Sequence, residues 1–315
     1  MTRAGRWLMT FACMAAVADA SMAAPSATPA AQAYIEHYGI DFPLDNNEQE
    51  IIDLYTRILA ATPHDNSQLR IFRDQRYGAD ARNRLDVHVT RQAAVAPRPV
   101  LIFFHGGGFV EGNTWVSREI YDNVGNYFAR QGFVSIVATY RLAPASQWPS
   151  GIEDVTGAVR WAQEHASEYD GDQRQIYVMG HSAGAAHVAD YIFQGANAAT
   201  LPVAGAILLS GVYRATAGDS VYFGADPSRW AQESALDQVA GSRPVPIMVA
   251  FAEYDPPTMQ AESMELVRRL CERDHACPTI KWVAGHNHMS LIFHVDSADD
   301  SIGADIAAFV RAHGR

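Results

Sequence analysis

Residues 175–184, with the sequence QIYVMGHSAG, carry the strongest local indication of the fold. Its first five residues are typical of a buried strand, and the run that begins at Ala183 is typical of a helix. The pattern Gly-x-Ser-x-Gly at their junction predicts a sharp strand-to-helix turn from which the serine side chain projects. Gly180 and Gly184 suit this turn, because side chains at these positions would collide across it. Ser182 is therefore a candidate nucleophile.

The pattern around Ser182 has a second interpretation. A Gly/Ser turn before a helix also arises where the serine only caps the helix start. A serine hydroxyl is a poor nucleophile at neutral pH and needs an adjacent base. The choice between the two interpretations therefore depends on the rest of the chain.

A glycine-rich segment follows another buried strand. Residues 100–104 (VLIFF) are continuously apolar, as expected for a strand covered on both faces, and they run into HGGGF at residues 105–109. Three consecutive glycines let backbone N–H groups approach a ligand, and in acyl transfer such donors stabilise a negative oxygen. A plain glycine-rich turn or a phosphate loop is the alternative. A phosphate loop is disfavoured because neither GxGxxG nor GxxxxGK[ST] is present.

Three motifs occur in a fixed order: HGGGF at residues 105–109, YRLAP at residues 140–144 and GHSAGA at residues 180–185. Together they resemble the α/β-hydrolase esterases related to hormone-sensitive lipase. The last motif is also similar to that of bacterial carboxylesterases and arylformamidases of the same fold. The resemblance covers about residues 65–315.

This resemblance implies positions for the oxyanion hole. The amides of Gly107, Gly108 and Ala183 would surround the carbonyl oxygen of a substrate attacked by Ser182. The chain departs from the family pattern at His181, where the lipase-like branch more often has Asp.

An acidic residue follows a late strand. Residues 245–252 are typical of a strand and lead into the segment EYDPP at residues 253–257. An acid just past a late strand is where this fold places the residue that orients the catalytic histidine. Asp255 matches the family position, and Pro256 with Pro257 fixes the loop. Glu253 is the alternative, and an acid that only caps the helix expected over residues 258–271 is a further one.

Histidines follow the last predicted strand, residues 279–283. The segment GHNHMS at residues 285–290 offers two candidates for the base that takes the proton from the serine. Similarity to the His-x-x-Ile-Ile ending of related esterases favours His288, with His286 as the alternative. His294 is expected to pack against the C-terminal helix. The order Ser182, Asp255, His288 is the order that this fold requires.

Alternation of apolar strands with helical segments predicts the fold class. The expected fold is α/β, a mostly parallel sheet of about eight strands flanked by helices. Alternating residues at 69–73 and 84–89 predict an antiparallel pair at one sheet edge. Further helices are expected over residues 116–131 and 152–169. Catalytic loops then belong at the carboxyl ends of the parallel strands.

The chain divides into three predicted parts: a signal peptide at residues 1–23, an N-terminal extension at residues 24–64 and an α/β-hydrolase catalytic domain at residues 65–315. The extension contains a predicted helix at residues 47–60. It is either an ordinary core helix or, with its surroundings at residues 34–63, part of a lid over the pocket. A small cap insertion is expected at about residues 211–243.

Five aromatic side chains are candidate substrate contacts, because a pocket is usually lined by apolar and aromatic groups. They are Phe109, Tyr213, Tyr222, Phe223 and Trp230.

Three other polar residues near the motifs are expected to be structural. Arg141 and Asp154 are candidates for a buried ion pair that braces the loops behind the site. His187, one turn beyond the serine, is expected to pack rather than to react.

The N-terminus predicts export. Arg3 and Arg6 precede the apolar run at residues 7–17, and small residues follow, as in a secretory signal peptide. The run is shorter than the roughly 20 residues of a membrane span. We therefore expect a secreted or periplasmic protein with no membrane insertion after cleavage.

Charge and cysteine content limit the partners. The formal net charge of −11 argues against nucleic acid as a partner.

In an oxidising compartment Cys271 and Cys277 are expected to form a disulfide, with two free thiols as the alternative. A zinc site is disfavoured because His275 alone lies nearby. No metal or cofactor is implied, and the oligomeric state stays open.

These observations predict a serine hydrolase that cleaves small to medium carboxylic esters through an acyl-serine intermediate. The alternatives are an amide-directed hydrolase, either a formamidase or a peptidase, and a non-catalytic binding protein on the same fold. A binding protein would be expected to lack one of the triad or oxyanion residues, and the sequence retains them all.

Overall fold

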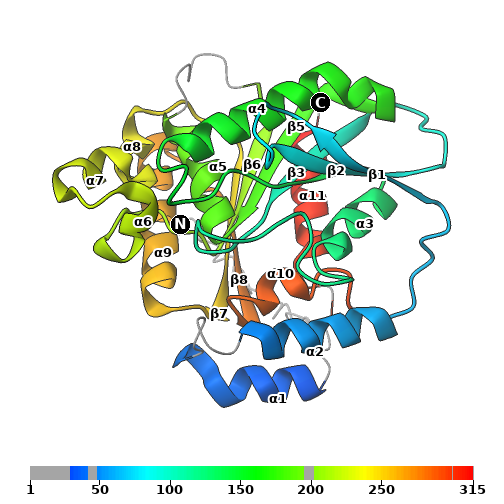
Figure 1. Cartoon of the computed structure of the whole chain (residues 1–315), viewed down its shortest axis with the longest axis horizontal. Coiled ribbons are helices and arrows are strands. Elements are labelled where there is room, and N and C mark those ends of the chain that lie inside the picture. The colour runs from blue at the N-terminus through cyan, green and yellow to red at the C-terminus, as the bar shows by residue number, and fades with distance from the viewer. Residues whose placement is uncertain (1–28, 42–47, 195–201, 300, 315) are drawn as a thin grey trace, which may run out of the picture.

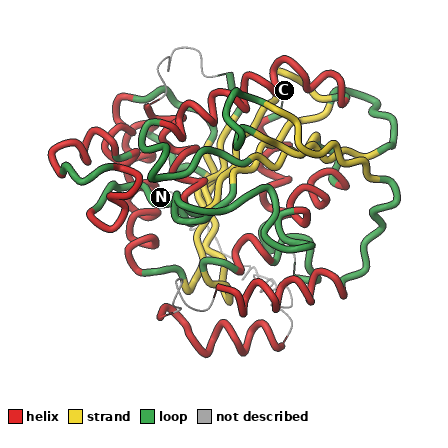
Figure 2. Tube along the Cα trace, viewed as in Figure 1, coloured by secondary structure: helices red, strands yellow, loops and turns green. Residues whose placement is uncertain are grey.

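The computed structural model describes residues 29–41, 48–194, 202–299 and 301–314, and the predicted signal peptide lies outside them. An eight-stranded sheet runs through the described part of the chain, with helices on both faces (Figures 1 and 2). The strand order is β1-β2-β4-β3-β5-β6-β7-β8. The strands are β1 (Leu69–Arg76), β2 (Arg84–Thr90), β3 (Arg98–Phe104), β4 (Val134–Ala138), β5 (Gly171–His181), β6 (Gly205–Leu209), β7 (Ile247–Tyr254) and β8 (Thr279–Asn287).

The direction of the strands agrees with the sequence. β1 pairs with β2, and β2 with β4, in antiparallel register, whereas every pair from β4 to β8 is parallel. The predicted α/β fold with an antiparallel edge is thereby confirmed. All parallel strands end at the same edge of the sheet, where loops from several strands meet.

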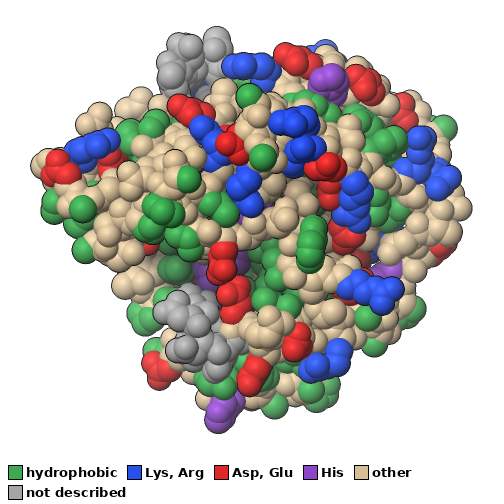
Figure 3. Space-filling view, in the orientation of Figure 1, with side chains coloured by type: hydrophobic (Ala, Val, Ile, Leu, Met, Phe, Trp, Pro, Cys, Tyr) green, Lys and Arg blue, Asp and Glu red, His purple; other side chains and the backbone are tan. Residues whose placement is uncertain are grey.

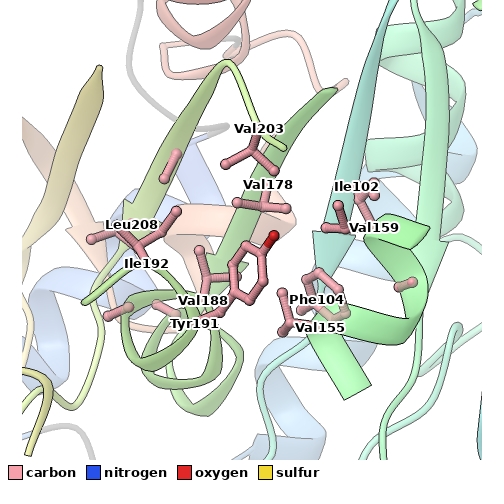
Figure 4. Close-up of a cluster of buried hydrophobic side chains, with 14 of the residues drawn as sticks. Ile102, Phe104, Val155, Val159, Val178, Val188, Tyr191, Ile192, Val203 and Leu208 are labelled. Carbon is pink, nitrogen blue, oxygen red and sulfur yellow. The ribbon is translucent and has the colours of Figure 1, made fainter. Parts of the chain in front are cut away.

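Side chains of each central strand alternate between two hydrophobic cores. On β3, Ile102 and Phe104 face one core, whereas Leu101 and Phe103 face the other, and all four are fully buried. Figure 4 shows the first core, where Ile102 and Phe104 meet Val155 of α4. The helices of this face are α4 (Ser150–His165), α5 (Ala183–Gln194), α8 (Ala235–Gln238) and α9 (Pro257–Asp274).

The second core lies under the N-terminal and C-terminal helices. These are α1 (Pro29–Tyr38), α2 (Glu48–Ala61), α3 (Asp122–Arg130), α10 (Ser290–Phe293) and α11 (Gly303–His313). α2 buries Ile51, Tyr55 and Leu59, and the Tyr55 ring lies 6.2 Å from that of Phe293. The predicted helix at residues 47–60 is therefore packed on the second core, at the edge of the fold where Figure 1 shows it.

One predicted helix is shorter than expected. The sequence suggested a helix over residues 116–131, but α3 begins only at Asp122. Tyr121 before it has a φ of 60°, which is left-handed, and the Ser117 hydroxyl accepts hydrogen bonds from the amides of Glu119 and Ile120. These local bonds make a turn where the helix was expected.

The segment between β6 and β7 holds the short helices α6 (Ser220–Phe223), α7 (Pro227–Glu233) and α8. They occupy the place of the predicted cap insertion. A disulfide joins Cys271 in α9 to Cys277 before β8. Among the helices described, none is long and apolar enough to cross a membrane.

Candidate active site

Ser182 lies in the turn between β5 and α5 with a φ of 55°, a left-handed conformation that is strained for a serine. The flanking glycines make the turn possible. A Cβ on Gly180 would lie 2.3 Å from the carbonyl oxygen of Gly184, and a Cβ on Gly184 would lie 2.2 Å from that of Phe104. The predicted collision across the turn thus holds for Gly180, whereas Gly184 is required by the neighbouring strand β3.

The structure brings the three predicted catalytic side chains together. Nε2 of His288 lies 2.9 Å from Oγ of Ser182, and Nδ1 of the same ring lies 2.9 Å from Oδ1 of Asp255. They come from three separate loops at the carboxyl edge of the sheet. All are buried, with 8% of Ser182 and 3% of His288 exposed. This geometry allows the histidine to accept the hydroxyl proton while the carboxylate orients its ring.

The carboxylate of Asp255 is held at both oxygens. Its Oδ2 accepts hydrogen bonds from the amide of Ala252, at 2.7 Å, and from the hydroxyl of Ser210. The alternative acid, Glu253, accepts a hydrogen bond from the amide of Gly285 at 2.8 Å. Glu253 thus holds the end of β8 just before His288, and Asp255 is the acid that contacts the histidine.

The other two histidines of this region point elsewhere. The ring nitrogens of His286 lie 3.0 Å from Asp299 and 3.1 Å from the Ser290 hydroxyl. Its ring stacks on that of His294 at 3.9 Å, and His294 bonds Ser290 and Ser301. Both rings therefore brace the loop behind His288.

The glycine loop lies beside the serine. Gly107 has a φ of 128° and Gly108 a φ of 53°, and both line the same cavity as Ser182 and Ala183. Among the described residues, no hydrogen bond uses the amide N–H of Gly107 or Gly108. A Cβ on Gly107 would lie 2.2 Å from the carbonyl oxygen of Glu111, so that position accepts only glycine. These amides can serve as the predicted oxyanion donors.

The cavity over Ser182 has a volume of about 730 Å³. Its lining includes three carboxylates, from Glu48, Glu111 and Asp219, and none of the described lining residues is Lys or Arg. Burial raises the pKa of Asp219. Figure 3 shows a hollow near the centre of one face that acidic and hydrophobic side chains border.

The sequence predicted only part of the lining of this cavity. Of the five aromatic candidates, Phe109 alone lines it. Tyr213, Tyr222, Phe223 and Trp230 are not among its lining residues, so their role as substrate contacts stays a prediction. Their polar atoms are used within the protein: the hydroxyls of Tyr213 and Tyr222 accept from backbone amides, and the Trp230 indole donates to Gly224.

These aromatics instead support Phe109. The Tyr222 ring stacks on Phe109 at 4.5 Å, and Phe223 contacts it edge-on at 5.5 Å. The residues that the sequence did not indicate come mainly from α2 and from residues 110–116. Apart from glycines, these lining residues are Glu48, Gln49, Ile52, Val110, Glu111, Asn113, Trp115, Val116, Tyr121, Val212, Asp219, Met259 and Met289.

Two further histidines are buried behind the site. Burial lowers the pKa of His105 to about 4 and that of His187 to about 3. The His187 ring packs against Phe109 and Tyr140, as expected of a structural residue. The expected ion pair is present, with Nε of Arg141 2.8 Å from Oδ1 of Asp154.

One group of side chains has the composition of a metal site. Asp86, His88 and Asp122 lie within reach of a common ion. The Arg73 guanidinium already bridges the two carboxylates, at 2.8 Å and 2.6 Å. This cluster is best described as an ion-pair network of the sheet edge.

Comparison with known proteins supports a relationship to esterases. The family model described as BD-FAE matches residues 85–201, less than half of the chain. Esterase LipC of Mycobacterium tuberculosis is 38% identical over 108 residues, which are 34% of this chain and 26% of LipC. Carboxylesterase NlhH of the same organism is 30% identical over 168 residues, which are 53% of this chain and 51% of NlhH. The chain thus spans about half or less of the length of these curated relatives.

Solved structures confirm the fold. The structure of a mutant of esterase rPPE complexed with (S)-Ac-CPA superposes with a TM-score of 0.69 at 21% identity, over 92% of this chain and 99% of the other. This match shows the fold of a known esterase, and the sequence relatives add similarity to esterases over part of the chain.

Proposed function

We propose that this chain is a serine carboxylesterase that hydrolyses small to medium carboxylic esters. The observation that carries the proposal is the line of hydrogen bonds from Ser182 through His288 to Asp255, each 2.9 Å long, beside the amides of the glycine loop in one cavity. Similarity to esterases over part of the chain supports it.

The first half of the reaction forms an acyl-serine. Oγ of Ser182 attacks the ester carbonyl carbon while Nε2 of His288 takes the hydroxyl proton, and Asp255 stabilises the imidazolium. The amides of Gly107, Gly108 and Ala183 hold the oxygen that becomes negative. As the bond from carbon to the alkoxy oxygen breaks, the imidazolium gives its proton to the departing alcohol.

The second half releases the acid. His288 takes a proton from a water molecule, and the resulting hydroxide attacks the acyl carbon. The same oxyanion donors stabilise the second tetrahedral intermediate. When the bond to Oγ breaks, the proton returns to Ser182 and the free enzyme is restored.

The test is hydrolysis of p-nitrophenyl esters from acetyl to decanoyl by the wild type and by Ser182→Ala. We expect the highest activity on short or medium chains and no activity above background in the variant. Activity of the wild type on p-nitroanilides but on no ester would assign amide chemistry instead. Equal activity of the wild type and the variant would contradict the assignment of Ser182.

We further propose that the chain is exported. The sequence of residues 1–23 and the Cys271–Cys277 disulfide support this, because disulfides persist in oxidising compartments. N-terminal sequencing of the protein from the periplasm or medium tests the proposal. A chain recovered only from the cytosol with its first residues intact would contradict it.

A further inference from the structure

His181 precedes the nucleophile and has no role in the mechanism above. Its side chain is buried, with 1% exposed, at the carboxyl end of β5. Nε2 of its ring lies 2.9 Å from the backbone carbonyl oxygen of His288, and the two imidazoles contact each other with centroids 4.7 Å apart. The residue beside the nucleophile therefore contacts the backbone of the base.

The hydrogen bond fixes the proton of the His181 ring. A carbonyl oxygen only accepts, so Nε2 must carry the hydrogen and donate. Burial, and to a smaller extent the neighbouring His288, lowers the pKa of His181 well below its ordinary value. The ring therefore stays neutral when His288 becomes an imidazolium, and it keeps the same donor throughout the reaction.

The other edge of the ring meets the oxyanion loop. A Cβ on Gly106 would lie 3.1 Å from Nδ1 of His181. The ring thus fills the space between the first glycine of the loop and the His288 backbone. It connects three elements of the site: the nucleophile turn, the oxyanion loop and the base loop.

We propose that His181 is a positioning residue that holds the backbone of His288 so that its Nε2 stays within hydrogen-bond distance of Ser182. The base needs such support because it lies in the turn after β8 rather than in a strand or helix. A misplacement of about 1 Å can lower a rate about 100-fold. The inference rests on the proposed serine-hydrolase function.

The experiment compares His181→Phe with His181→Gln. Phenylalanine keeps a ring of similar size but cannot donate a hydrogen bond, whereas the glutamine amide can donate to the same carbonyl. For His181→Phe we expect kcat on p-nitrophenyl acetate to fall by about 10- to 100-fold with KM changed less than about threefold. His181→Gln should recover a substantial part of kcat.

The matched control is His88→Phe. His88 is also fully buried and its Nδ1 lies 3.0 Å from Oδ1 of Asn126, but it belongs to β2 and contacts none of the triad residues. If loss of any buried histidine lowered activity through stability alone, the control would lose kcat as His181→Phe does. We expect its kcat to remain near that of the wild type at a temperature where all variants are folded.

Two other measurements separate positioning from the choice of substrate. The rate at which a fluorophosphonate modifies Ser182 measures how strongly His288 activates the Ser182 hydroxyl, and it does not depend on any ester. This rate should fall in His181→Phe. The downfield proton resonance of His288 Nδ1–H should broaden or shift in that variant and return in His181→Gln. If the wild type were inactive on all esters but labelled normally, and labelling still fell in His181→Phe, the proposed function would be contradicted and the positioning role supported. Wild-type values of kcat and labelling in His181→Phe, or equal losses in the Phe and Gln variants, would overturn the positioning role.

Discussion

Asp255 and Glu253 lie two residues apart, and the structure gives them different tasks. Asp255 bonds the ring of His288, whereas Glu253 bonds the amide of Gly285. A carboxylate that holds the histidine tautomer and stabilises the imidazolium acts directly on the rate. One that anchors a backbone amide acts on the loop.

Substitution of the two acids by their amides separates these tasks. We expect Asp255→Asn to lower kcat on the order of 10⁴-fold, because an amide favours the wrong tautomer of His288. Glu253→Gln should keep kcat within about tenfold, since its carbonyl oxygen can still accept from Gly285. Steady-state kinetics of both variants provide the measurement. A larger loss of kcat in Glu253→Gln than in Asp255→Asn would show that Glu253, and not Asp255, is the acid that supports His288.

The sequence indicated the three proposed catalytic residues but not the residues that hold them in place. Ser182, Asp255 and His288 belong to motifs whose order along the chain is characteristic, so they could be named from the sequence. The contact of His181 with the carbonyl of His288 joins residues 107 positions apart. No local pattern reports such a contact, because it depends on how two loops meet in space.

The helix α2 contributes to both the core and the cavity. Ile51 is fully buried among apolar side chains, and its neighbour Ile52, with 8% exposed, lines the cavity over Ser182. Residues about 100° apart on a helix face different surroundings. This pair therefore tests whether α2 is a wall of the active site.

We expect Ile51→Ala to lower the free energy of unfolding by about 2–5 kcal/mol, as for other buried isoleucines, with little change in substrate preference. Ile52→Ala should be less destabilising and should shift the preferred ester toward longer or bulkier groups. Thermal unfolding and the p-nitrophenyl ester series measure the two effects. An unchanged preference in Ile52→Ala would show that α2 does not limit the substrate.

Helices and strands were predicted best where apolar residues recur at a regular spacing along the chain. The central strands, α2 and the helix after Ser182 appear close to their expected positions. The start of α3 was missed because Ser117 makes local hydrogen bonds that the apolar pattern does not show. The aromatics of the insertion could not be placed from the sequence, because an aromatic residue packs equally well on a pocket wall or behind one, as Tyr222 does behind Phe109.

At the scale of the whole molecule, buried histidines couple folding to pH. His187 has a folded pKa of about 3 because of burial, against about 6.5 in an unfolded chain. Below about pH 6.5 the unfolded state therefore binds one more proton than the folded state at this residue. Its contribution to stability is complete above about pH 6.5 and is lost as the pH falls toward about 3.

The variant His187→Leu isolates this contribution from those of other buried groups. The stability difference between wild type and variant should change by about 1.4 kcal/mol per pH unit below about pH 6.5, in favour of the variant. Urea unfolding at several pH values between about 7 and 4.5 gives this difference. A pH-independent difference for His187→Leu would mean that the histidine titrates normally in the folded protein.

The carboxylates around the cavity have a consequence for turnover. A neutral ester, the proposed substrate, would enter a space lined by Glu48, Glu111 and Asp219 without electrostatic repulsion. In the proposed reaction the acid leaves as an anion, and like charges at short range repel each other. The negative charge of the cavity lining therefore weakens binding of the acid product relative to binding of the neutral ester. We expect an enzyme that is inhibited only weakly by the acid it makes.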